Sequence, residues 1–227
     1  MDNLLPLLQL SDPALPIGGF SHSAGLETYV QLGIVKDKES ARAFITNQLS
    51  HNLQFTDAAF VSLAYDAAKA NDLHGLQKLD DECTAVKLPK EMRQASQKVG
   101  VRLLKLFAPL APNQFTNDYR KIVENGEAAG HYSIVFGLLS HSLQILKKDA
   151  LRGFYYNAAA GMVTNSVKLI PLGQQDGQEV LFSLHELIDG LSVKSLSPDR
   201  ELMGLCCSAF DIRCMQHENL YSRLYMS

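Results

Sequence analysis

Hydrophobic positions three and four residues apart recur along most of the chain, and this period predicts helices. The strongest pattern runs from Pro89 to Ala108, where apolar side chains share one face. Gly100 lies inside it, and because an interior glycine costs about 1 kcal/mol relative to alanine, we expect another helix to pass close to its backbone. The basic side chains of this segment are typical of a solvated face, with a surface for an acidic partner as the alternative. They are Arg93, Lys98, Arg102 and Lys105.

The same period predicts further helices before and after this one. Asn125 and Gly126 are typical of the C-terminal end of a helix, where one residue adopts the left-handed backbone conformation. Ser197 is predicted to cap the last helix, with Pro198 as its first residue. A short loop over 172–178 is expected to separate two of the helices. The first two long segments, 38–53 and 59–67, are predicted to form a helical hairpin. The expected helical segments are 3–10, 38–53, 59–67, 73–89, 89–108, 115–126, 134–146, 151–170, about 178–187 and 197–217.

These segments predict an all-α, single-domain bundle of about ten helices. Runs that alternate Val, Ile or Thr with polar residues are scarce and tryptophan is absent, which argues against a sheet protein. No internal repeat or low-complexity linker divides the chain. We therefore expect residues 1–227 to form one helical domain, in which segments 1–22 and 217–227 are flexible without a partner.

The stretch from Leu10 to Val30 combines a shaped loop with the start of a helix. Its prolines and its paired glycines exclude a helix interior, whereas the helical spacing begins after Ser23. A phosphate-binding loop is excluded because Leu26 follows Gly25 where such a loop places its lysine. The run Ser21-His22-Ser23 contains a nucleophile and a base, but no carboxylate is indicated to orient the histidine. We interpret these side chains as caps of the following helix.

Composition narrows the possible functions of the 227 residues. A net charge of −3 gives no basic footprint for nucleic acid, so this class is excluded. No apolar run has the roughly 18 residues of a membrane helix, and the N-terminus lacks the pattern of a secretion signal. The four cysteines are too few and too bunched for a disulfide framework, which indicates a reducing cytoplasm. They are Cys83, Cys206, Cys207 and Cys214.

Two features near the C-terminus have alternative interpretations. On a continuous helix Cys207, Cys214 and His217 would share one face and could bind a transition metal, but buried cysteines in a core explain the pattern equally well. The tail that follows carries Leu and Tyr side chains in an amphipathic arrangement around Arg223. Chain ends are usually poorly ordered unless they are held, so this tail is expected to dock on the chain's own core or on a partner.

Five patterns together resemble the urease accessory protein UreF family, and they cover nearly the whole chain in order. Each pattern alone would be weak, but their agreement is specific. They are LSDPALPIGGFSHSAGLE over 10–27, RQASQKVG over 93–100, His131 with Gly137, PLGQQDGQ over 171–178 and YSRLY over 221–225.

This resemblance implies an all-α homodimer without enzymatic activity of its own. Members of the family form a complex with UreH, also called UreD, and with the GTPase UreG, and this complex delivers nickel to the urease apoprotein. Nickel would then be handled by the complex, with no cofactor bound directly by this chain. Alternatively the chain could be a direct nickel carrier, or a GTPase-activating regulator of UreG with Arg223 as its finger.

The resemblance also implies which residues meet the partners. Tyr29 and Arg223 match positions associated with recruitment of UreG. The remaining residues expected to bind partners are Glu27, His22, Tyr221 and Tyr225. We further expect UreH to order the tail against the loop over 13–23, so that the N-terminal and C-terminal motifs form one surface.

Overall fold

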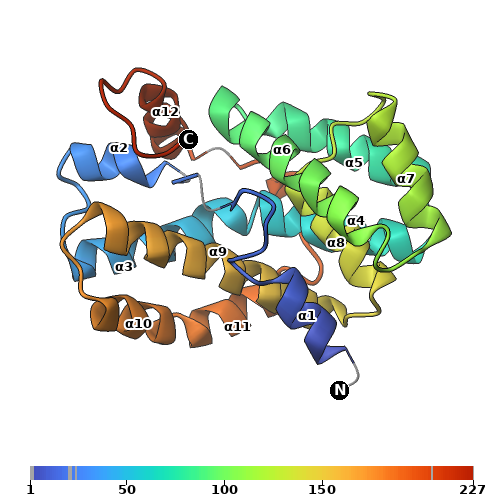
Figure 1. Cartoon of the computed structure of the whole chain (residues 1–227), viewed down its shortest axis with the longest axis horizontal. Helices are drawn as coiled ribbons and strands as arrows, with labels where there is room; N and C mark the ends of the chain where they lie inside the picture. The colour runs from blue at the N-terminus through green and yellow to red at the C-terminus, as the bar shows by residue number, and fades with distance from the viewer. Residues whose placement is uncertain (1–2, 20–21, 24, 206, 227) are drawn as a thin grey trace.

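Helices build the whole architecture of the computed structural model, which describes residues 3–19, 22–23, 25–205 and 207–226 (Figure 1). These residues contain no β-strand, so the predicted all-α fold is confirmed. Within the same residues, no helix is both long enough and apolar enough to cross a membrane. The elements are α1 (Leu4–Leu10), α2 (Leu26–Gln31), α3 (Lys38–Asn47), the π-helix η2 (Gln48–Leu53), α4 (Asp57–Lys69), α5 (Leu73–Val86), α6 (Lys90–Phe107), α7 (Gln114–Glu124), α8 (Tyr132–Ser142), α9 (Lys147–Leu169), α10 (Gln174–Ser183), α11 (His185–Lys194), the 3-10 turn η3 (Arg200–Leu202) and α12 (Ser208–His217).

Helix α8 forms the centre of the bundle, as its broad apolar pattern predicts. It packs against α4 and α6, and every side chain over 133–140 is buried. The long helix α9 crosses the molecule next to it, and α10 and α11 pack along its other side (Figure 1). A helix that is apolar all round has to be surrounded, so α8 and α9 fix the places of the remaining helices.

The close approach expected at Gly100 is present. A Cβ atom at this position would lie 2.1 Å from the carbonyl oxygen of Gly130 and 2.6 Å from the backbone nitrogen of Tyr132. The chain that touches α6 here is the entry to α8. The prediction of a neighbouring helix is therefore confirmed in substance, and glycine is required because any side chain would displace this entry.

Two predicted helix boundaries were wrong. The stretch over 172–178 is mostly helical, because α10 begins at Gln174, and a second helix, α11, continues from His185 to Lys194. The predicted last helix from Ser197 is broken into η3 and α12, and Asp199 caps η3. Gly204 causes this break, because its φ of +75° lies in the left-handed region and its Cα packs against Val86.

The predicted hairpin over 38–67 is present only in part. Helix α3 continues without interruption into the π-helical turns of η2, as the helical spacing to Leu53 predicts. Of these two elements, η2 makes the closer packing with α4, and the main neighbours of α4 are α8 and α5. The apolar face of α4 therefore belongs to the central packing rather than to a two-helix unit.

Candidate interaction site at the C-terminal segment

Three helix ends meet where the chain finishes, and together they bind residues 218–226, which we call the C-terminal segment. Figure 1 shows α12 lying beside α2 and next to the start of α6. Glu27 is in the first turn of α2, Glu91 is in the first turn of α6, and His217 is in the last turn of α12. We call these three residues and Arg223 the anchor cluster.

The anchor cluster is a continuous chain of hydrogen bonds between carboxylates and donors. Nε2 of His217 lies 3.1 Å from Oε2 of Glu27, and Nδ1 lies 2.7 Å from Oε2 of Glu91. The Arg223 guanidinium donates to the other oxygen of Glu91 over 2.7 Å. Glu27 also accepts the backbone N–H groups of Leu224, at 2.7 Å, and Tyr225, at 3.1 Å. Two carboxylates from α2 and α6 thus hold both the last helix and the backbone that follows it.

Burial makes these contacts strong. Glu27 is 3% exposed and His217 is fully buried, and hydrogen bonds that involve ionised groups are about twice as strong as neutral ones. The helix dipoles favour the same arrangement, because carboxylates are stabilised at helix N-termini and a cationic ring at a helix C-terminus. The Nε2 contact to Glu27 joins residues 190 positions apart in the sequence.

The C-terminal segment presents a mixed surface above this anchor. Tyr225 is buried, and burial raises the pKa of its hydroxyl, with the charge of Glu27 adding to the effect. Tyr221 is fully exposed and Leu224 is mostly exposed, while the Arg223 side chain retains 39% of its accessible surface. The backbone carbonyl of Ser222 accepts a further hydrogen bond from Gln31 at the end of α2. An exposed aromatic ring and a guanidinium are therefore carried two residues apart by a backbone that hydrogen bonds hold to α2.

The predicted binding residues occupy three different positions. Tyr221 and Arg223 are on the surface, whereas Glu27 lies beneath the C-terminal segment and Tyr225 is a buried side chain of that segment, so a contribution of these two to partner binding would be indirect. Tyr29 is half-buried, and its ring packs against Phe44 with centroids 5.0 Å apart. Whether any of them binds a partner stays a prediction.

In the chain without partners, the hydrogen bonds of the C-terminal segment go to α2 and α6, through Glu27, Gln31 and Glu91. The ordering of this segment against the loop over 13–23 by UreH stays a prediction. Of the proposed capping residues, Ser21 lies outside the described residues. Ser23 does face α2, and its hydroxyl accepts the N–H of Glu27 over 3.5 Å.

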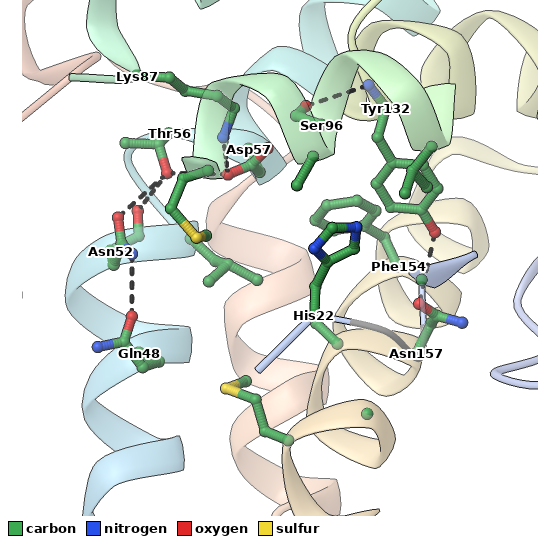
Figure 2. A pocket seen from close by; sticks show the side chains of 18 of the residues that line it. His22, Gln48, Asn52, Thr56, Asp57, Lys87, Ser96, Tyr132, Phe154 and Asn157 are labelled. Carbon is green, nitrogen blue, oxygen red and sulfur yellow. Dashed lines mark hydrogen bonds and ion pairs between the residues drawn. The ribbon is translucent and has the colours of Figure 1, made fainter. Parts of the chain in front are cut away.

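His22 points into a cavity of about 320 Å³ between η2, α6 and α9 (Figure 2). Burial lowers the pKa of its imidazole, and the nearby charges of Lys98 and Arg102 lower it further. Several polar groups around this cavity bond to one another: Lys87 pairs with Asp57 at 2.8 Å, and Tyr132 donates to Asn157 at 3.4 Å. The remaining lining is largely apolar, with Met92, Val99 and Phe154 among its members.

The suggested Cys–Cys–His metal set is not assembled. Cys207 precedes the first residue of α12 and its thiol donates to the carbonyl of His51. Cys214 is buried in α12, and burial raises the pKa of its thiol, so it stays protonated. His217 is occupied by its two carboxylates. Among the described residues no group of three or more His, Cys, Asp or Glu side chains is arranged to hold a metal ion.

Sequence reasoning missed Glu91 and misjudged His217. Glu91 stands among charged residues at the start of an amphipathic helix, where a carboxylate is ordinary, and His217 was considered only as a metal ligand. One signal was available for Glu91, because it lies in the first turn of a helix, where the dipole favours a carboxylate. The preference of a helix end for one sign of charge does not indicate which side chain that charge will contact in the folded chain.

Comparisons with known proteins give matches over the whole chain. The UreF family model matches residues 35–185. The urease accessory protein UreF of Actinobacillus pleuropneumoniae serotype 5b (strain L20) is 44% identical over 227 residues, which is 100% of both chains. The protein of the same name from Haemophilus influenzae (strain PittGG) is 44% identical over 100% of this chain and 97% of its own length. That of Bacillus sp. (strain TB-90) is 36% identical over 100% of both chains.

Proposed function

Because this chain belongs to the UreF family of urease accessory proteins, we propose that it assembles with UreH (UreD) and recruits the GTPase UreG through its C-terminal segment. In this proposal the chain acts in the cytoplasm as a homodimer without catalysis of its own. The complex, rather than the chain alone, passes nickel to the urease apoprotein. Nickel is therefore cargo of the assembly.

The observation that carries this proposal is the exposed arrangement on the C-terminal segment. Tyr and Arg are the residues most enriched at the energetic centres of interfaces, and Tyr221 and Arg223 stand two residues apart on a fixed backbone. A fixed backbone lowers the entropy that a partner would otherwise have to remove on binding. Arg223 also keeps a bond to Glu91, which orients its guanidinium.

Co-purification tests the proposal directly. Tagged UreH, this chain and UreG are mixed with GTP analogue and magnesium, and the bound fraction is quantified. We expect Arg223→Ala and Tyr221→Ala to abolish or strongly reduce the capture of UreG while UreH stays bound to the chain. Arg42→Ala is the matched control, because Arg42 is an exposed arginine on α3 with an ion pair to Glu39 and, among the described residues, no ion pair to the anchor cluster. Full capture of UreG by both variants would contradict the proposal.

The two alternatives give different results in the same system. A direct nickel carrier would bind nickel tightly as the purified chain, and substitution of Cys207, Cys214 and His217 would remove this binding. An activating role predicts that the chain raises the GTP turnover of UreG and that Arg223→Lys cancels the rise, because an arginine finger stabilises the transferring phosphate with a bidentate guanidinium.

A further inference from the structure

The ring of His217 lies between two carboxylates, and this geometry determines its charge. Each ring nitrogen faces one carboxylate oxygen, Nε2 toward Glu27 and Nδ1 toward Glu91. A neutral imidazole has a single N–H, so only the imidazolium donates to both. The neutral ring would turn a lone pair toward one of the carboxylates at hydrogen-bond distance.

The charge balance of the anchor cluster leads to the same conclusion. Glu91 pairs with the guanidinium of Arg223, both glutamates contact the His217 ring, and a cationic His217 makes the cluster of four side chains electrically neutral. A neutral His217 would leave one carboxylate uncompensated in a site where Glu27 is 3% exposed, and an unpaired buried charge is strongly destabilising.

The other titratable groups near His217 do not replace this charge. Cys214 lies one turn earlier on α12 itself, and burial raises the pKa of its thiol. From α2 and α6 the facing groups are Glu27 and Glu91, and from the C-terminal segment the cation is Arg223, which reaches the cluster through Glu91.

We propose that His217 is the positioning residue of the C-terminal segment, and that the segment is held on α2 and α6 only while His217 carries its second proton. Loss of the proton breaks one of the two ring contacts and leaves excess negative charge on the glutamates. Glu27 then loses its orientation toward the N–H groups of Leu224 and Tyr225, and the segment detaches together with Arg223. The effect of His217 on the recruitment of UreG rests on the proposed function, whereas the attachment of the C-terminal segment to α2 and α6 does not.

Nuclear magnetic resonance of the labelled full-length chain tests the attachment. The amide signals of Leu224 and Tyr225 and the ring nitrogens of His217 are followed from about pH 5 to about pH 9, which covers the titration of histidine and stops short of tyrosine. We expect one common transition. Across it, we expect the protection of these two amides, corrected for intrinsic exchange, to fall about 10- to 100-fold as pH rises, the effect of losing a charged hydrogen bond.

Variants separate positioning from simple stability. His217→Gln supplies a side-chain donor without charge, so we expect low protection of both amides at every pH and no transition. His74→Gln is the matched control, because His74 is an exposed histidine on α5, and it should keep the wild-type curve. A His217 ring whose charge does not change between about pH 5 and about pH 9, or amides whose protection does not follow the ring, would overturn the inference. This result needs no variant, so it holds even if His217→Gln folds poorly.

Recruitment distinguishes the two proposals. If Arg223→Ala and Tyr221→Ala both capture UreG normally, the proposed function fails, while the titration of the segment stands or falls by its own spectra. If the segment titrates as expected, capture of UreG by the wild-type chain should weaken with rising pH, and capture by His217→Gln should be weak throughout. Strong capture by a variant whose segment is shown to be detached would refute the link between attachment and recruitment.

Discussion

The Cα of Gly100 faces the carbonyl group of Gly130 so closely that a Cβ atom would lie 2.1 Å from its oxygen. Gly100→Ala therefore has to push the entry of α8 away from α6. We expect the free energy of unfolding to fall by about 1–3 kcal/mol, the usual cost of overpacking a core, as measured by urea denaturation. Gly190→Ala is the control, because a Cβ there meets nothing within 4 Å on an exposed turn of α11. It should be neutral or slightly stabilising, and equal losses in both variants would contradict this explanation.

Asp80 fixes the same entry from the other side. Its buried carboxylate accepts the backbone N–H groups of Ala129, Gly130 and His131, the last two over 3.0 and 2.8 Å. Asp80→Asn places an amide N–H against these donors, so we expect a loss of about 2–4 kcal/mol in the free energy of unfolding. Asp81→Asn, the adjacent but exposed carboxylate, should change stability by less than about 0.5 kcal/mol.

His131 makes the stability depend on pH. Burial lowers the pKa of its imidazole to about 4, although the neighbouring Asp80 acts to raise it. The unfolded chain therefore binds more protons than the folded chain between about pH 6.5 and pH 4, and the stability must fall as pH decreases through this window. We expect His131 to account for about 3 kcal/mol of this fall. The measurement is the free energy of unfolding against pH, compared between the wild type and His131→Gln, whose slope should be smaller in this window.

Tyr221 and Tyr225 should respond differently to substitution although they lie four residues apart. Tyr221 is fully exposed, so Tyr221→Ala should leave the thermal midpoint unchanged and should reduce the affinity for the UreG-containing complex about tenfold or more. Tyr225 is a buried side chain of the C-terminal segment, so Tyr225→Ala should lower the amide protection of the segment. Tyr225→Phe should preserve that protection, because none of the described residues is a hydrogen-bond partner of the hydroxyl. Interchanged effects of the two alanine variants would contradict the described orientation.

Hydrophobic periodicity predicted where the long helices lie. Each of them buries one face or all of its surface, and the buried positions recur every three or four residues in the local sequence. It located α6, α8 and α9 closely, and it identified Gly100 as a contact point. It failed at α10 and at Gly204. Gly173 and Gly177 resemble a loop in sequence, but Gly173 is the N-cap of α10 and Gly177 lies inside it. At Gly204 a Cβ atom would lie 2.6 Å from the side chain of Val86, a contact between residues more than a hundred positions apart that no local pattern indicates.

The sequence by itself determined the all-α class, the family and the presence of a specified loop and an amphipathic tail. Only the tertiary structure decided how the helix that follows the loop and the amphipathic tail contact each other. Glu27, Glu91 and His217 each look like ordinary charges at helix ends, because a helix dipole selects the sign of a charge but not its partner. Packing of α12 against α2 and α6 excludes water from the place where they meet. In that low dielectric the three charges become a single anchor for Arg223, which no local pattern encodes.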